Sequence, residues 1–293
     1  MTNRDSRAYR VGPFSAWVNS NISSLRLTLD DVYRDYEKLT SAEEADFRIT
    51  LDASRNWLGK RQLLFKAGYQ SPFSPAKPDH ALAVLEWGIN WCVSQYMHVL
   101  LMLHSAAVER NGHGVLLPAH PGSGKSTLGF ALDRLGYRML CDEFGLVDPE
   151  SGCLVPYPRL VPLKNDSIDV VSDMFPEAIR GPELTGTRKG RVVHFKPSRN
   201  AIHSDQVTVP PRWIVFPAFE RGCVTELKSM TKEQAFVKLT ANSFNYHVMG
   251  QPGFHCVSRL VSECECYYLR FSSIEAAKRV LDGLTDHPSP PAI

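Results

Sequence analysis

Hydrophobic positions occur along the chain in short runs separated by turn residues, a pattern that predicts a mixed α/β protein. Apolar runs over 99–108 and 115–119 flank an Asn-Gly pair, which is a strong signal for a β-hairpin. A glycine-rich segment, a helix over 125–135 and an apolar strand over 138–141 come next. We therefore expect a strand, a loop, a helix and a second strand in direct succession.

The chain is expected to form two domains, a small α+β domain over 1–78 and a larger α/β domain over 79–286. Three prolines between 72 and 78 exclude a helix interior and a central strand, so the boundary is placed there. In the first domain a strand is expected at 25–29, directly before a helix. The proline-rich tail 287–293 is expected to be disordered. Further helices are expected over 79–95, 167–175, 231–242 and 273–284.

Composition and charge narrow the class of protein. Hydrophobic residues make up 43% of the 293 residues and charged residues 22%, values typical of a globular protein. A formal net charge of +2 argues against nucleic acid as the main partner, because it supplies no extended basic field. No apolar run reaches the roughly 18 residues that span a membrane, and no secretory h-region follows the polar N-terminus. We therefore expect a cytoplasmic protein without a membrane partner, whose seven cysteines are reduced thiols.

The glycine-rich segment is close to the phosphate-binding pattern G-x-x-x-x-G-K-[ST], with Ala119 at the first glycine position. Glycines allow successive backbone N–H groups to turn inward, and the positive end of the following helix also attracts phosphate. Lys125 is expected to contact the β- and γ-phosphates of ATP, and the Ser126 hydroxyl to bind Mg²⁺. The expected nucleotide-binding residues are Pro121, Gly122, Ser123, Gly124, Lys125, Ser126 and Thr127.

Two acidic residues follow the strand after the loop helix. Asp142 and Glu143 are expected at the same sheet edge as the loop, where one carboxylate holds Mg²⁺ and the other accepts the proton of an attacking hydroxyl. Because adjacent strand residues point to opposite faces, we expect different roles for the two, which spacing alone does not assign. His104, on the strand that enters the hairpin, is a candidate phosphate contact or proton shuttle, with a packed core histidine as the alternative.

Basic residues elsewhere are further candidates. The segment Arg188-Lys189-Gly190-Arg191 is a flexible positive stretch that suits closure over the γ-phosphate, with Arg188 as its catalytic candidate and a solvated charge run as the alternative. Arg159 and Lys164-Asn165 lie in a stretch punctuated by prolines, which suits a fixed loop at a site.

At these residues the chain resembles the kinases related to HPr kinase/phosphorylase, and within them the group called HPr-kinase-related kinase A. The resemblance spans nearly the whole chain. It is carried by six segments: Glu86-Trp87-Gly88-Ile89-Asn90-Trp91, Leu103-His104-Ser105-Ala106, Pro121-Gly122-Ser123-Gly124-Lys125-Ser126-Thr127, Cys141-Asp142-Glu143, Leu163-Lys164-Asn165-Asp166-Ser167-Ile168 and Phe244-Asn245-Tyr246.

The resemblance implies a P-loop kinase core of the type shared with phosphoenolpyruvate carboxykinase. It also implies that Asp142 is the base for a seryl hydroxyl, that Lys125 clamps phosphate and that Glu143 is a supporting acid. In HPr kinases a histidine precedes the loop by one hairpin, which corresponds here to His104. The chain departs from that pattern in having Glu143 as the second acid of the pair and in lacking the Glu-x-Arg-Gly signature near Arg188. These departures leave the identity of the phosphoryl acceptor open.

We therefore expect an ATP- and Mg²⁺-dependent kinase that transfers the γ-phosphoryl group to a hydroxyl. A serine of a protein or peptide is the favoured acceptor, and a small hydroxylated molecule is the alternative. A nucleotide-gated binding module with little catalysis is the competing class. A GTPase is disfavoured, because no Asn-Lys-x-Asp motif follows the loop. Assembly into homo-oligomers is left open.

Overall fold

The computed structural model describes residues 5–187 and 189–286, which form two compact units. Unit 1 combines Met1–Met97 with Arg159–His203, and unit 2 combines His98–Pro158 with Ser204–Ile293. The compact units therefore divide the chain differently from a single boundary near residue 78. The expected disorder of 287–293 concerns residues outside the described part of the chain.

Unit 1 contains two sheets in the part of the chain that the structure describes. The larger has the strand order β3-β1-β2-β4-β5, in which β2 and β4 are parallel and the other neighbours are antiparallel. The smaller has the order β11-β13-β12. The elements of unit 1 are β1 (Asp5–Val11), β2 (Phe14–Ser20), α1 (Ser23–Val32), β3 (Glu37–Lys38), the 3-10 turn Ala42–Glu44, β4 (Phe47–Arg55), β5 (Arg61–Ala67), the 3-10 turn Pro78–His80, α2 (Ala81–Tyr96), β11 (Val161–Lys164), α4 (Asp166–Met174), β12 (Leu184–Thr187), β13 (Gly190–Phe195) and α5 (Arg199–His203).

The proline-rich segment before α2 is part of unit 1 rather than a linker between domains. Ala76 pairs with Leu63 of β5 through two backbone hydrogen bonds of 2.8 and 3.0 Å. The helix that follows packs on β4 and β5, and a Cβ added at Gly88 would lie 2.0 Å from the Phe65 ring. Glycine at this position lets α2 approach the sheet closely, so the helix belongs to the N-terminal core.

A buried ionic cluster joins distant segments of unit 1. Glu86 of α2 accepts hydrogen bonds of 2.5 Å from the Tyr33 hydroxyl and from the Arg159 guanidinium. Arg159 and Glu86 are 5% and 1% exposed, so neither charge is satisfied by water. Breaking such a pair by removing one partner leaves an uncompensated buried charge, which costs about 3–5 kcal/mol. Arg159, a candidate for the functional site, thus has a structural role in unit 1.

Unit 2 is built on an eight-stranded mixed sheet among the described residues, with the order β10-β9-β6-β7-β14-β16-β15 and β8 paired to β6. Strands β7, β14 and β16 are parallel. The elements of unit 2 are β6 (Leu101–Arg110), β7 (His113–Pro118), α3 (Lys125–Arg134), β8 (Arg138–Cys141), β9 (Phe144–Val147), β10 (Leu154–Val155), β14 (Pro211–Phe219), β15 (Glu226–Ser229), α6 (Lys232–Ala241), α7 (Tyr246–Met249), α8 (Gln251–Glu263), β16 (Glu265–Phe271) and α9 (Ile274–Asp286).

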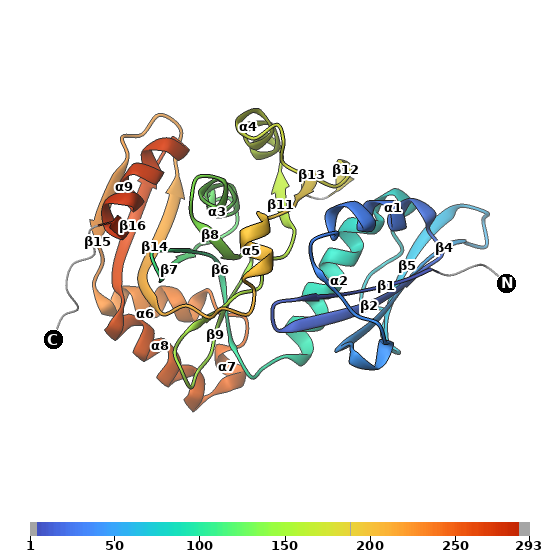
Figure 1. Cartoon of the computed structure of the whole chain (residues 1–293), viewed down its shortest axis with the longest axis horizontal. Coiled ribbons are helices and arrows are strands. Elements are labelled where there is room, and N and C mark those ends of the chain that lie inside the picture. The colour runs from blue at the N-terminus through green and yellow to red at the C-terminus, as the bar shows by residue number, and fades with distance from the viewer. Residues whose placement is uncertain (1–4, 188, 287–293) are drawn as a thin grey trace. The chain divides into compact units, whose positions relative to one another are not determined.

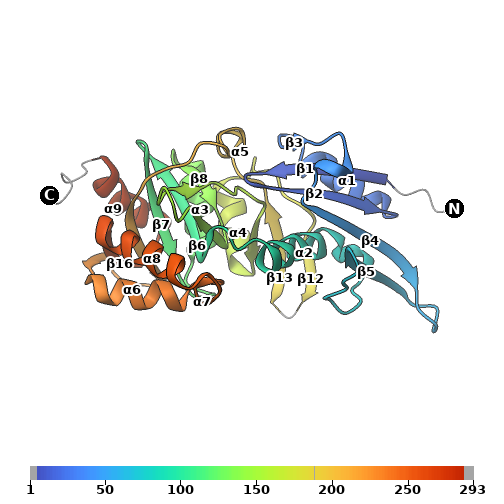
Figure 2. The same cartoon turned by 90° about the horizontal axis from the view of Figure 1, so that it is seen from below.

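The main core of unit 2 lies between this sheet and two helices on one face. Leucines of α3 and α9 meet Trp213 of β14 and Phe271 of β16 in one buried cluster. Helices α6, α7 and α8 gather on the opposite side of the sheet (Figures 1 and 2). The two units are thus both mixed α/β, as the hydrophobic pattern predicts. The strand, loop, helix and strand from β7 to β8 are confirmed.

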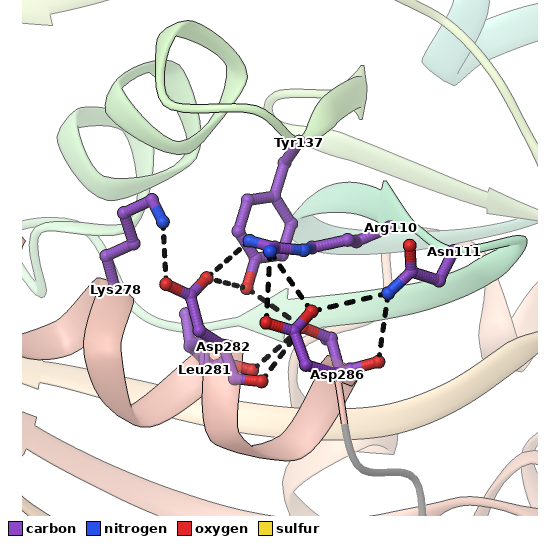
Figure 3. A network of polar contacts seen from close by, with 8 residues as sticks. Arg110, Asn111, Tyr137, Lys278, Leu281, Asp282 and Asp286 are labelled. Atoms are coloured by element: carbon purple, nitrogen blue, oxygen red, sulfur yellow. Dashed lines mark hydrogen bonds and ion pairs between the residues drawn. The ribbon is translucent and has the colours of Figure 1, made fainter.

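The hairpin between β6 and β7 turns at Asn111 and Gly112, whose φ angles are 53° and 78°, as the Asn-Gly pair predicts. Its turn is tied to the last helix (Figure 3). The Arg110 guanidinium binds Asp282 at 2.5 Å and Asp286 at 3.0 Å, and it lies 5.0 Å from the Tyr137 ring centroid. This network fixes the position of α9 on unit 2.

Candidate functional site

The glycine-rich loop leaves β7 at Pro118 and enters α3 at Lys125. Gly122 and Gly124 have φ angles of 90° and 82°, in the left-handed region that glycine adopts without strain. The loop is fixed on its far side by the Phe219 N–H, which donates to the Ser123 carbonyl at 3.0 Å. Alternating left-handed glycines turn backbone N–H groups toward a common side, the arrangement that binds anions.

The start of α3 has features of an anion site. Its N-cap, Gly124, makes no side-chain cap, and the first turn contains no acidic residue. The first N–H groups of a helix have no partner within the helix and carry partial positive charge. Lys125 is 7% exposed, and within 5–187 and 189–286 its ammonium makes no hydrogen bond or ion pair. The Ser123 hydroxyl is also buried, and its oxygen has no hydrogen-bond partner among the described residues.

Asp142 and Glu143 lie in the turn between β8 and β9. Both strands pair with β6, through Ala107↔Cys141 and His104↔Phe144. The acid turn is therefore next to Ser105, whose N–H donates to the Glu143 carbonyl at 3.3 Å.

The opposite side of Ser105 faces the beginning of the loop, through the pair Ser105↔Pro118. Two strand spacings of about 4.8 Å separate the backbones on either side, a span of roughly 10 Å. The strand register thus places the acid turn (Asp142 and Glu143) on one side of Ser105 and the start of the glycine-rich loop on its other side.

The expectation of strand alternation for the two acids is wrong. Asp142 and Glu143 belong to no strand, and Glu143 has a φ of 71° although it is not a glycine. A left-handed conformation costs a residue with a Cβ about 1–2 kcal/mol, and such strain is concentrated at functional sites. The turn, rather than the pleat of a strand, therefore sets the directions of the two side chains. Asp142 is 4% exposed, and Glu143 is less buried.

The electrostatics around Cys141 connect the acid turn with the loop. Burial raises the pKa of the Cys141 thiol well above its usual value, and the Asp142 carboxylate raises it further. The Lys125 ammonium acts in the opposite direction on the same thiol. Charge interactions with a buried group are weakly screened, so both the Asp142 carboxylate and the Lys125 ammonium act on the Cys141 thiol. The loop lysine and the first acid thus act in opposite directions on the same buried thiol.

His104 lies on β6 directly before Ser105, half-buried beside the acid turn. Its N–H donates to the Asn242 carbonyl at 2.6 Å, and its carbonyl accepts from the Ala119 N–H at 3.3 Å. Its ring meets the Phe244 ring at 5.5 Å. The backbone of His104 thus links the start of the loop to the segment that follows α6.

That segment is held to β6 by the side chain of Asn245, which is fully buried. Its amide oxygen accepts from the Met102 N–H at 2.9 Å, and its amide nitrogen donates to the Leu100 carbonyl at 2.8 Å. Sequence reasoning gave Asn245 no role beyond the family resemblance. No local sequence pattern predicts this role, because the hydrogen bonds of the Asn245 side chain are made to residues that are distant in sequence.

The remaining candidates belong to unit 1. Arg188 lies outside the described residues. The Arg191 guanidinium binds Glu183 at 2.7 Å and Asp169 at 3.0 Å, and its hydrogen bonds hold the pKa of both carboxyls below their usual values. Asn165 accepts from the Arg191 N–H at 3.1 Å. Arg191 is thus already paired with two carboxylates.

The metal candidates are Ser126, Asp142 and Glu143. No group of three or more His, Cys, Asp or Glu side chains in the described part of the chain is arranged to hold a metal ion. Magnesium at a nucleotide site usually takes one or two protein carboxylates and completes its shell with water and phosphate oxygens. A site of that kind needs no cluster of three protein ligands.

Comparison with known proteins gives no further guidance on the site. No model of a known protein family matches the chain, and no curated protein matches it. The function of the loop and the acid turn is therefore inferred from their residues.

Proposed function

We propose that the chain is an ATP- and Mg²⁺-dependent kinase of the P-loop type, which transfers the γ-phosphoryl group to a hydroxyl. A serine of a protein or peptide is the proposed acceptor. The observation that carries the proposal is a pair of polar groups at the loop, the ammonium of the largely buried Lys125 and the buried Ser123 hydroxyl oxygen, neither of which hydrogen-bonds to another described residue. A buried hydroxyl without a hydrogen-bond partner is costly, and a bound polyphosphate would supply a partner for both the hydroxyl and the ammonium.

The same residues fit the nucleotide that the proposal requires. The N–H groups of the loop and of the first turn of α3 would bind the phosphates, with Lys125 as the positive charge. Ser126, in that first turn, would bind Mg²⁺. ATP supplies the transferable group, and Mg²⁺ offsets the phosphate charge.

Asp142 has the position and burial expected of a base. It follows Cys141, whose thiol is also affected by the Lys125 ammonium, and it is nearly excluded from water. In this role it would accept the proton of the acceptor hydroxyl, while Glu143 supports the metal. His104, on the neighbouring strand, would contact phosphate or hold a proton.

The test combines direct binding with phosphoryl transfer. Purified wild type, Lys125→Ala and Asp142→Asn are incubated with γ-labelled ATP, Mg²⁺ and a lysate of the host, and nucleotide affinity is measured separately by calorimetry. Lys228→Ala is the matched control, because it removes an ammonium from an exposed position of the same unit. We expect Lys125→Ala to weaken ATP binding by roughly 10–100-fold, the effect of losing a charged hydrogen bond. We expect Asp142→Asn to retain ATP but to slow transfer by roughly 10²–10⁴-fold.

Three results would speak against the proposal. ATP affinity that is equal in wild type and Lys125→Ala would remove the anion site. Transfer unchanged by Asp142→Asn would remove the base. Tight ATP binding without any labelled product in the lysate would favour a nucleotide-gated binding module instead.

A further inference from the structure

The hairpin between β4 and β5 extends beyond the sheet of unit 1. The pairing of β2 with β4 ends at Ser20↔Leu51, whereas β4 and β5 remain paired to Arg55↔Arg61. The last part of the hairpin is thus a two-stranded ribbon, which reaches past α1 and α2 in both views (Figures 1 and 2). We call residues 56–60 the hairpin tip.

Two large apolar side chains are exposed at this tip. Trp57 is 90% exposed and Leu58 is 57% exposed. A single exposed apolar residue is ordinary on a protein surface, but an adjacent tryptophan and leucine at the end of a projecting ribbon form a site for contact. Tryptophan is suited to a boundary between apolar and polar surroundings, because its ring is apolar and its N–H is a donor.

Most backbone N–H groups of the tip have hydrogen-bond partners within the hairpin. The Asn56 side-chain oxygen accepts from the N–H groups of Leu58 and Lys60, both at 3.0 Å. The Gly59 N–H donates to the Asn56 carbonyl, and the Asn56 N–H donates to the Lys60 carbonyl, both at 2.9 Å. The Arg55 guanidinium covers the Gly59 carbonyl at 2.7 Å. These internal bonds lower the cost of removing the tip from water, because buried backbone groups without partners are the main penalty for doing so.

The charge around the tip has one sign. The sequence from 53 to 78 contains no aspartate or glutamate, although the whole chain has a net charge of only +2. Three of its cations, Arg55, Lys60 and Arg61, are exposed at or beside the tip. The apolar side chains of the tip and the basic residues beside it complement a surface that has an anionic outer layer over an apolar interior.

We propose that the hairpin tip docks unit 1 onto an anionic membrane surface. Trp57 and Leu58 enter the boundary between headgroups and acyl chains, while Arg55, Lys60 and Arg61 bind lipid phosphates. The contact is peripheral. It requires no spanning segment, and no described helix combines the length and apolar character needed to cross a bilayer. The proposal departs from the expectation of no membrane partner that the sequence suggested.

A protein partner is the less favoured occupant. A stable protein interface buries about 800 Å² on each side, usually over a broad complementary surface. Two exposed apolar side chains at the end of a narrow ribbon match shallow insertion better.

The experiment uses the full chain without nucleotide. Wild type, Trp57→Ala and Tyr69→Ala are sedimented with vesicles of phosphatidylglycerol and phosphatidylcholine, and with vesicles of phosphatidylcholine alone. Tyr69 is the matched control, because it is an equally exposed aromatic residue beyond the opposite end of β5. Wild type is expected to bind the anionic vesicles and to lose binding when salt is raised. Trp57→Ala is expected to reduce partitioning by roughly tenfold, and Tyr69→Ala to leave it unchanged.

A second measurement locates the inserted side chain. Brominated phosphatidylglycerol quenches tryptophan that enters the bilayer, so quenching should be present in wild type and lost in Trp57→Phe, which keeps an aromatic ring for binding. Equal loss of binding in Trp57→Ala and Tyr69→Ala would overturn the proposal. So would the absence of sedimentation with anionic vesicles at low salt, which would instead favour an acidic protein groove as the occupant of the tip.

Discussion

Substitution of Gly124 by alanine tests the shape of the loop most directly. Gly124 is the N-cap of α3 and has a φ of 82°, a conformation that costs alanine about 1–2 kcal/mol. A Cβ at this position would lie 3.0 Å from the Phe219 Cβ and 3.2 Å from the Phe271 ring. Phe271 is 2% exposed and cannot move freely, so overpacking adds about 1–3 kcal/mol. The sum is roughly 2–5 kcal/mol.

Gly122→Ala is the matched comparison. Gly122 has a φ of 90°, but a Cβ there would meet no heavy atom within 4 Å. Its cost is therefore the conformational strain alone, about 1–2 kcal/mol. Urea unfolding gives the free energies of the two variants, and calorimetry with ATP and Mg²⁺ gives their affinities. We expect Gly124→Ala to be the less stable of the pair and to lose more nucleotide affinity, since displacement of Phe219 disturbs its bond to Ser123. Equal costs for the two variants would refute the close packing behind the loop.

Three further predictions follow from other parts of the molecule. Gly88→Ala should destabilise unit 1 by about 2 kcal/mol or more, because its Cβ would lie 2.0 Å from the buried Phe65 ring, and chemical denaturation of the variant measures this; a stability equal to that of wild type would contradict the close approach of α2. Cys141 should resist iodoacetamide in the folded protein, because burial keeps its thiol protonated, whereas the less buried Cys153 and Cys223 should react first; mass spectrometry of the alkylated peptides decides this. Burial raises the pKa of Tyr9 to about 12, so the unfolded chain loses this proton at lower pH than the folded chain and stability falls as pH rises from about 10 to about 12. Replacing Tyr9 by phenylalanine should reduce that fall by about 1 kcal/mol in urea unfolding at about pH 11, and an identical pH dependence in the variant would exclude this origin.

Short sequence motifs predicted correctly those parts of the fold whose backbone conformation depends on a few adjacent residues. The Asn-Gly turn and the glycine-rich loop can be predicted from sequence, because only a few residue types adopt left-handed backbone conformations without strain. The succession from β7 to β8 follows from these signals and from the apolar runs between them. The order of the strands does not, since β8 pairs with β6 and β14 lies beside β7 through contacts distant in sequence.

The error in the N-terminal region shows how two periodicities compete. Leu25, Leu27 and Leu29 alternate, which predicts a strand, yet the segment is the helix α1. Leu27 is 65% exposed, whereas Leu25, Leu29 and Val32 are buried. The buried positions are spaced by four and three residues, the period of a helix face. Alternation over five residues was too short to exclude that period.

Within the candidate site, too, the sequence predicted the position of a residue but not its backbone conformation or its partners. The position of Asp142 after a strand was predictable, but the left-handed backbone of Glu143 was not, because glutamate has no preference for it. The Glu86–Arg159 pair was also hidden, since its members are distant in sequence and meet only in the folded unit. Arg159 was therefore predicted only as a site candidate in a fixed loop, whereas the structure buries it against Glu86 in unit 1.

The division of the chain has a consequence for how the protein can be made. Unit 1 contains residues from two separate stretches, 1–97 and 159–203, and unit 2 surrounds the second of them in sequence. During synthesis the rest of unit 1, from β11 to α5, does not exist until the chain has reached about residue 203. The loop helix α3 likewise emerges long before β14 and β16, which cover its core face. Neither half is a contiguous gene fragment, so dissection of the protein requires joining distant segments rather than simple truncation.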